Sequence, residues 1–155
     1  MPKKTISRDV PLAEITLRRY EKPVELKGRD LVRKLCLSLG LLQPGDSRDV
    51  IVDVFYVLLA ARKNNELLSS DEVEKRVIEQ RKKNKLAMLG IAGSNIRRQL
   101  KRLRDLFLVE KKANDYRITE DAKLLEVFEE KIERFLVPSI ISRVREYVER
   151  VDGEF

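Results

Sequence analysis

The chain has 155 residues and a formal net charge of +7, because 33 Lys and Arg residues outnumber 26 Asp and Glu residues. This length fits one compact domain with a buried core. No apolar run approaches the roughly 20 residues that span a bilayer, and the basic N-terminus leads into no apolar signal-peptide stretch. The sequence therefore predicts a soluble, cytoplasmic protein.

Composition also excludes several chemistries. The chain has no histidine and one cysteine, so imidazole catalysis, an internal disulfide and a multi-cysteine metal site are excluded. Cys36 lies among leucines and is predicted to be a small buried hydrophobic residue rather than a nucleophile. The glycines form no phosphate-binding loop pattern. We therefore expect no enzymatic activity, no metal and no cofactor, while the abundance of Lys, Arg and Glu resembles that of thermophile proteins.

Residues 1–27 are predicted to form a basic N-terminal arm. Three prolines, Pro2, Pro11 and Pro23, divide it, and the residues around Ile15 could form one extended piece. A strand packed on the body, a strand exchanged with a partner and a disordered tail are all compatible with this pattern, and we favour partial order. The basic residues of the arm include Lys3, Lys4, Arg8, Arg18 and Arg19.

Two helices are predicted next. The first covers 28 to about 41 and ends at Gln43-Pro44-Gly45. The second starts at Asp46 or Ser47 and runs to Asn64-Asn65. The second helix carries the strongest core signal, a buried stripe with helical spacing. That stripe consists of Val50, Ile51, Val54, Phe55, Leu58 and Leu59. A stub of strand at 66–68 follows.

A capping box of Ser69 and Glu72 then begins a helix that runs into the basic residues 81–85. After a linker at 86–90, a further helix covers about 93–106. Its apolar residues fall within about 80° of arc at 100° per residue. These residues are Ile96, Leu100 and Leu103. Residues 108–112 and 116–119 are predicted as two strands joined by a turn.

The region from 120 to 151 is predicted to be helical, with one apolar stripe before Pro138 and another after it. The proline either kinks one long helix or lies near the start of a second one. The predicted fold is therefore mainly α with a small β-hairpin. The first stripe is Leu124, Phe128, Ile132 and Phe135, and the second is Ile141, Val144, Val148 and Val151.

The positive charge is concentrated in residues 81–112, which carry a net +9, whereas the other 123 residues sum to −2. In the helix at 93–106, Arg98, Lys101 and Arg102 are predicted to point away from the apolar stripe. A helix with this arrangement suits contact with phosphates. The alternative is an ordinary solvated basic face, but acids are scarce nearby, so we favour nucleic-acid binding.

The order of elements, and the stretch from Gly90 to Lys111, resemble the winged-helix DNA-binding superfamily. Leu100 and Leu103 match the apolar positions of its recognition helix, and Leu108-Val109 match the start of its first wing strand. The resemblance covers roughly residues 47–119. It implies a winged helix-turn-helix core, and the apolar patterns outside this range add an N-terminal helix and a long C-terminal helix to it.

The resemblance further implies that the helix at 93–106 enters the DNA major groove. The residues then expected to face DNA are Ser94, Asn95, Arg97, Arg98, Lys101 and Arg102. The wing residues expected to approach the backbone or minor groove are Lys111, Lys112, Asn114 and Arg117. Lys82, Lys83 and Lys85, just before the linker, are also expected to face DNA. Of these residues, Ser94, Asn95 and Arg98 are the candidates for base contacts.

Two departures from the superfamily pattern stand out. Phe107 replaces the usual glycine after the recognition helix, and phenylalanine tolerates a left-handed backbone poorly, so either a different turn or a longer helix is expected. The connection from 83 to 90 is also longer than usual, and it either projects its lysines toward DNA or disturbs docking. The predicted wing is short, with Asp115 at its tip.

The sequence is thus divided into a basic arm at 1–27, a winged-helix domain at 28–119 and a helical extension at 120–155. We prefer homodimerisation through the extension, while packing back on the chain's own first helices is the alternative. The expected function is double-stranded DNA binding by an archaeal-type transcriptional regulator or a small nucleoid-associated factor. A protein-interaction module of a larger assembly and RNA binding are the alternative functions.

Overall fold

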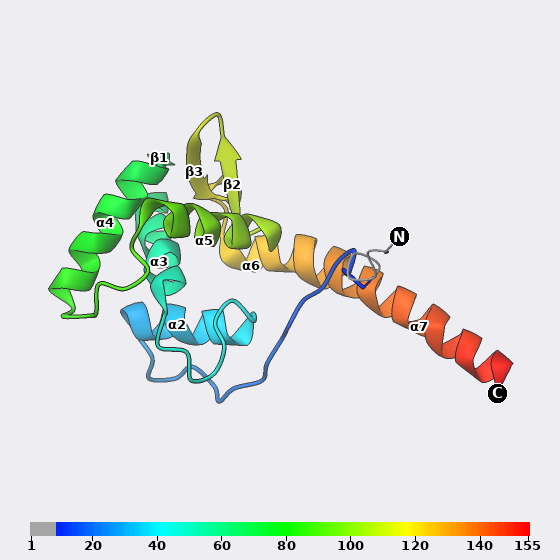
Figure 1. The fold of residues 1–155 in the computed structure, drawn as a ribbon. Helices are drawn as coiled ribbons and strands as arrows, with labels where there is room; N and C mark the ends of the chain where they lie inside the picture. The colour runs from blue at the N-terminus through cyan, green and yellow to red at the C-terminus, as the bar shows by residue number, and fades with distance from the viewer. Residues whose placement is uncertain (1–8) are drawn as a thin grey trace, which may run out of the picture.

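The structure is a computed structural model, and it describes residues 9–155. The predicted arm residues Lys3, Lys4 and Arg8 lie outside this range. The chain is mainly helical, with a small three-stranded antiparallel sheet and a long C-terminal helix (Figure 1). Residues 9–27 form neither a helix nor a strand.

Four helices and three short strands form the body. The helices are α2 (Gly28–Ser38), α3 (Val50–Arg62), α4 (Ser70–Lys83) and α5 (Gly93–Asp105), and the strands are β1 (Leu68–Ser69), β2 (Val109–Lys112) and β3 (Asp115–Ile118). The sheet order is β1-β3-β2, with Leu68 opposite Tyr116 and Val109 opposite Ile118. The predicted hairpin and strand stub are therefore confirmed, and the stub adds a third strand to the hairpin.

Helix α3 is the centre of the body, since it packs against α2, α4, α5 and β3. The sequence predicts one broad buried stripe on this helix. In the structure nearly the whole circumference is buried, because α2 covers one side of it and α4 and α5 cover others. The predicted cysteine environment is also confirmed. Cys36 is fully buried, and burial raises the pKa of its thiol to about 12.

A buried ion-pair cluster joins α2, α3 and α4. Asp53 has no exposed surface. Its carboxylate accepts hydrogen bonds from Arg29 Nε at 2.9 Å, Gln80 Nε2 at 2.7 Å and an Arg81 terminal nitrogen at 2.6 Å. Asp49 lies 3.1 Å from Arg81. Burial alone would raise the pKa of Asp49, but hydrogen bonds and charge from Arg29 and Arg81 outweigh it and lower that pKa. Arg81 is therefore a core residue and not part of the exposed basic segment.

Four helices end in the same way, with a left-handed residue just beyond the helix and two backbone hydrogen bonds that turn back on the last turn. In α5, Phe107 N–H donates to the Arg104 carbonyl and Leu108 N–H donates to the Leu103 carbonyl, which is a Schellman motif. The left-handed residues after α2, α3, α4 and α5 are Gly40, Asn65, Lys85 and Phe107.

The expectation that Phe107 would alter the turn is wrong. Its φ is 66°, so the phenylalanine adopts the conformation that glycine ordinarily supplies. Its ring packs edge-to-face against Phe135, with centroids 6.1 Å apart, and an aromatic pair of this geometry contributes about 0.5–1.5 kcal/mol. Its carbonyl also accepts a hydrogen bond from Thr119 Oγ1 at 2.7 Å. These contacts offset the cost of the left-handed backbone.

The arm is docked at the C-terminal end of α2. Arg18 N–H donates to the Ser38 carbonyl at 2.9 Å, and the Arg18 guanidinium donates to the carbonyls of Leu37 and Leu42 at 2.9 and 3.2 Å. The Leu37 and Ser38 carbonyls lie at the negative end of the helix, where a cation is favourable, and the Leu42 carbonyl belongs to the loop that follows. The favoured partial order is therefore confirmed for the part of the arm around Arg18.

Gly40 lies directly against this arm. Its φ is +71°, and a Cβ added there would lie 2.5 Å from Thr16 Cβ and 2.9 Å from the Thr16 carbonyl oxygen. We expect Gly40→Ala to lower the free energy of unfolding by at least about 2 kcal/mol, from left-handed strain and displacement of the arm. Urea unfolding measures this loss.

The matched control is Gly45→Ala. Gly45 has φ +83°, but a Cβ there would meet nothing within 4 Å, so only the left-handed strain of about 1–2 kcal/mol is expected. Equal losses in the two variants would show that the arm does not pack against Gly40.

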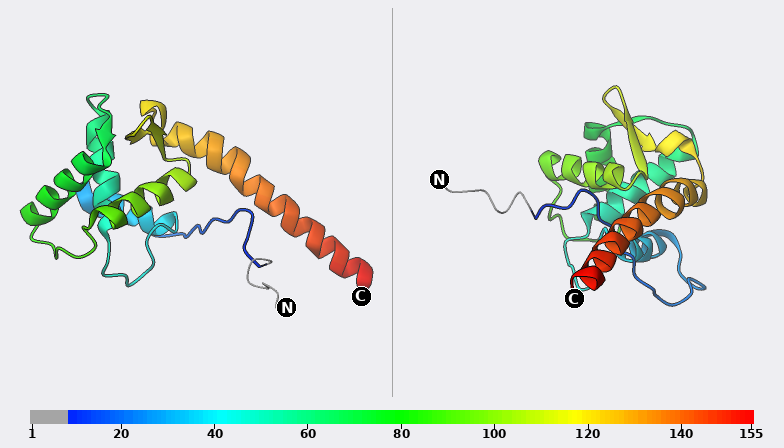
Figure 2. Two further views of the ribbon diagram at one scale, coloured as in Figure 1. Left: turned by 45° about the horizontal axis from the view of Figure 1, so that its top comes forward. Right: turned by 90° about the vertical axis from the view of Figure 1, so that its right-hand side faces the viewer.

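The C-terminal region continues from a 3-10 turn (Thr119–Asp121) through α6 (Leu124–Val127) and a π-helical segment (Phe128–Leu136) into α7 (Val137–Glu154). These last three segments form one rod that extends away from the body (Figure 2). Pro138 lies in the first turn of α7. Pro138 therefore lies near the start of a helical segment, as the second alternative predicts. That segment nevertheless continues the preceding one as a single rod, with a change of helix type just before the proline.

Only the first part of this rod packs on the body. Val127, Ile132 and Leu136 are buried, whereas the second predicted stripe is more than half exposed throughout. Packing of this second stripe back on the chain's own helices is therefore wrong. The exposed apolar residues of the rod after Pro138 are Ile141, Val144, Tyr147, Val148, Val151 and Phe155.

Candidate nucleic-acid interface

Helix α5 has two sharply different sides. Ile96, Leu100 and Leu103 face the core and have no exposed surface. The opposite side carries exposed polar and basic residues with helical spacing, so it cannot be buried without a charged partner. The exposed residues on that side are Ser94, Arg97, Arg98, Lys101, Arg104 and one acid, Asp105.

Most of these cations have no acidic partner in the described chain. Among residues 9–155, no carboxylate lies within ion-pair distance of Arg97, Arg98 or Arg104. Lys101 pairs with Asp105 at 2.9 Å, but both side chains are well exposed, and such a surface pair is worth less than about 1 kcal/mol. The outer side of α5 is therefore free to meet an anionic surface.

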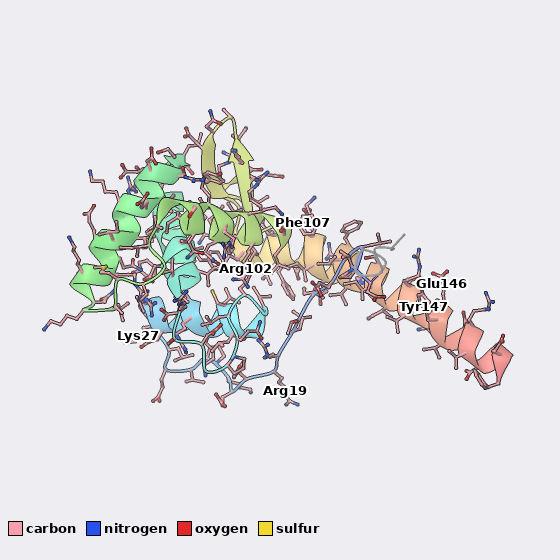
Figure 3. The ribbon with its side chains drawn as sticks, in the orientation of Figure 1. Arg19, Lys27, Arg102, Phe107, Glu146 and Tyr147 are labelled. Atoms are coloured by element: carbon pink, nitrogen blue, oxygen red, sulfur yellow. The ribbon has the colours of Figure 1, made fainter. Side chains whose placement is uncertain are left out.

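Two predicted DNA-facing residues of α5 are held by their own chain instead. Arg102 lies between α5 and the α2 side of the body (Figure 3), where its guanidinium donates to the Leu41 carbonyl at 2.8 Å and to Gln99 Oε1 at 2.9 Å. Asn95 Nδ2 donates to the Gly90 carbonyl at 2.7 Å, and Asn95 Oδ1 accepts from Gln99 Nε2 at 3.0 Å. The prediction that Arg102 points straight outward is corrected, because these bonds anchor α5 to the adjoining loops.

The β2–β3 hairpin presents a second group of cations. Lys111, Lys112 and Asn114 are exposed near its tip, which is a two-residue turn with Ala113 at φ 56°. Lys111 Nζ lies 5.7 Å from the centre of the Tyr116 ring. Asp115 lies directly opposite Lys112, next to the turn. The predicted acid at the tip is therefore present beside the two lysines.

Arg117, predicted as a wing contact, is locked at the base of the hairpin. Its guanidinium lies 2.6 Å from Glu110 and 3.3 Å from Asp121. Burial alone would raise the pKa of Glu110, but the Glu120 N–H and Arg117 outweigh it and lower that pKa. The prediction that Arg117 is available to DNA is therefore corrected, because its charge is neutralised and it fixes the hairpin on the 3-10 turn.

The three linker lysines, Lys82, Lys83 and Lys85, are exposed at the C-terminal end of α4. Two hydrogen bonds fix the linker that follows. Arg81 Nε donates to the Ala87 carbonyl at 2.7 Å, and Asn95 Nδ2 donates to the Gly90 carbonyl at 2.7 Å. Figure 1 places the end of α4 and the hairpin on either side of α5. The longer linker thus leaves α5 seated on α3 and α4.

The structure leaves fewer cations exposed than the sequence predicts. Those that remain exposed lie on three adjoining elements. The end of α4, the outer side of α5 and the hairpin tip keep their exposed charges, whereas Arg81, Arg102 and Arg117 are bound internally. Arg104 joins the outer side of α5 although it is absent from the predicted contact residues. A signal for Arg81 exists in the sequence, since it continues the i, i+4 spacing of the buried Val73 and Val77.

In the part of the chain that the structure describes, no three Cys, Asp or Glu side chains form a group that could hold a metal ion. Within the same residues, no helix combines the length and the apolarity needed to cross a membrane. No protein-family model matches the sequence, and no curated protein or solved structure shows significant similarity to it.

Proposed function

We propose that this protein binds double-stranded DNA as a winged-helix transcriptional regulator, with α5 as the recognition helix and the β2–β3 hairpin as the wing. The observation that carries the proposal is the contrast across α5, where a fully buried apolar side backs an exposed side with Arg97, Arg98 and Arg104. The order α3, β1, α4, α5, hairpin supports it, because the winged-helix arrangement has the same order.

The proposed DNA contacts are of two chemical kinds, contacts to phosphates and contacts to base edges. Phosphate oxygens are the expected partners of the cations, which supply affinity without sequence information. Ser94 and Arg98, near the exposed start of α5, are the candidates for base edges, since a recognition helix reads bases with its N-terminal residues. Asn95, Arg102 and Arg117 are positioning residues in this proposal. The cations assigned to phosphates are Arg97, Lys101, Arg104, Lys111 and Lys112.

The test is fluorescence anisotropy of the full chain with random duplex DNA, single-stranded DNA and structured RNA over a range of KCl concentrations. Five phosphate contacts predict that log K falls with log salt with a slope of about −4.5 for one chain. Duplex DNA is expected to bind most tightly. Preference for RNA, or binding to duplex that does not depend on salt, would contradict the proposal.

A second copy of this chain is the partner we propose for α7. Its exposed apolar residues Ile141, Val144, Val148, Val151 and Phe155 alternate in steps of three and four, which is the spacing of a coiled-coil seam. From Ile141 to Glu154 the helix has three arginines and four acids, so it offers no attraction to an anionic surface. The arginines Arg143 and Arg145 precede most of the acids, so an antiparallel copy opposes unlike charges.

Val148→Asp is expected to convert the dimer to a monomer, because it places a charge in the middle of this seam. Light scattering coupled to gel filtration measures the mass of each form. Ser142→Asp is the matched control, since Ser142 lies on α7 away from the seam and should leave the dimer intact. A wild-type chain that is monomeric at micromolar concentration would contradict this part of the proposal.

A further inference from the structure

A cavity of about 370 Å³ lies beside the proposed recognition helix, between the α2–α3 loop and α5. One wall is the loop from Leu41 to Arg48, the floor is the start of α3, and the other wall is the side of α5 that carries Arg98 and Arg102. This volume falls in the lower part of the range of small-ligand sites.

Three arginines and one acid line this cavity, namely Arg48, Arg98, Arg102 and Asp46. Within the described residues, no carboxylate pairs with Arg48 or Arg98. Arg102 is held in place by its bonds to the Leu41 carbonyl and Gln99. The lining therefore has an excess of positive charge, and one of its guanidinium groups is fixed before any ligand arrives.

The floor of the cavity adds to this preference. Val50 and Ile51 begin α3 and line the cavity. Asp49, at the N-cap, makes no capping hydrogen bond with its side chain, because its carboxylate is turned toward Arg29 and Arg81. The backbone N–H groups at the start of α3 thus receive no side-chain cap from Asp49.

We propose that this cavity is a phosphate-binding site in which Arg48 holds the oxygens of a phosphate group against Arg102, while Arg98, on the α5 wall, adds positive charge and remains the candidate for a base edge. Arginine forks match phosphate oxygens in paired hydrogen bonds, and the remaining lining supplies amide groups from Asn95 and Gln99. The phosphate is either a backbone phosphate of the duplex bound by α5, in which case the site rests on the proposed function, or the phosphate of a small free molecule.

The experiment compares wild type, Arg48→Ala and Lys63→Ala. Lys63→Ala is the matched control, because it removes one positive charge from an exposed side chain at the other end of α3 from the cavity. Each protein is titrated with inorganic phosphate and pyrophosphate by calorimetry, and with duplex DNA by anisotropy. Losing one phosphate contact is expected to weaken binding about tenfold at ordinary salt.

If Arg48→Ala weakens phosphate or pyrophosphate binding and the control does not, the site takes a free phosphate, whether or not DNA binds. If neither anion binds measurably but Arg48→Ala weakens duplex binding about tenfold more than the control, the site takes a backbone phosphate. If Arg48→Ala changes neither titration relative to the control, the proposal is overturned, and the DNA-binding proposal for α5 is unaffected.

Discussion

The double variant Arg97→Glu with Arg98→Glu is expected to lose duplex DNA binding by at least about 100-fold at 0.1 M salt. The lost phosphate contact of Arg97 costs about tenfold, and the lost base contact of Arg98 costs about 1–3 kcal/mol, which is tenfold or more. The new carboxylates also repel the backbone. Both side chains are exposed and have no carboxylate partner in the described chain, so the fold should persist. Anisotropy measures the affinity, and circular dichroism with urea unfolding verifies the fold.

The control is Arg19→Glu with Lys22→Glu, which changes the net charge by the same amount. Both residues are exposed on the arm, and Figure 3 shows Arg19 at the opposite end of the body from the hairpin. This variant should bind duplex DNA within about threefold of wild type at 0.1 M salt, where exposed charges act over only about 10 Å. Equal losses in the two variants would mean that net charge, rather than the α5 surface, governs binding.

Asp53→Asn is expected to lower the free energy of unfolding by about 3–5 kcal/mol, since it removes the charge from a buried ion pair and leaves Arg81 undercompensated. Asp53 is fully buried, and Arg81 is only 2% exposed. Such a loss is a large share of the 5–15 kcal/mol that typically stabilises a domain. Urea unfolding at neutral pH measures it, and a loss below about 1 kcal/mol would show that the cluster is not a structural centre.

Asp105→Asn is the matched control for Asp53→Asn, because it removes the same charge from an exposed pair with Lys101 on α5. Its effect on stability should stay within about 0.5 kcal/mol. The comparison separates the cost of a buried uncompensated arginine from the general effect of removing one carboxylate.

The helices and the hairpin could be predicted from the sequence because each carries a local signal. The apolar spacing of α5 gives its inner face, and that of α3 identifies it as a core helix, although α3 is buried on more sides than the stripe predicts. Ser69 begins α4 as expected, and its Oγ accepts a hydrogen bond from Glu72 N–H at 3.1 Å. Signals of this kind involve residues a few positions apart, so they survive in a single sequence.

The internal use of charge could not be predicted in the same way. Arg102 donates to the Leu41 carbonyl, 61 positions away in the sequence, and Arg81 pairs with Asp53, 28 positions away. The sequence alone does not show whether a basic residue lies on the surface or is bound inside the fold. The one local hint is that Asp53 interrupts the apolar run of α3 and Arg81 continues the apolar spacing of α4, which marks both as buried and hence as partners.

Phe107 and α7 illustrate two further limits. The residue preference for a left-handed backbone argues against Phe107, but tertiary contact with Phe135 overrides it. The apolar stripe of α7 predicts a face that needs cover, but its spacing alone does not distinguish the chain's own body from a second copy. The exposed rod decides against the chain's own body.

DNA contact through α5 and the hairpin is measured by a nuclear magnetic resonance titration of the labelled full chain with a duplex of about 16 base pairs. We expect the amide signals of residues 93–101 and 111–114 to shift on addition of DNA, whereas those of 141–155 should not. Shifts confined to the arm or the C-terminal rod, with α5 unchanged at saturating duplex, would contradict this contact.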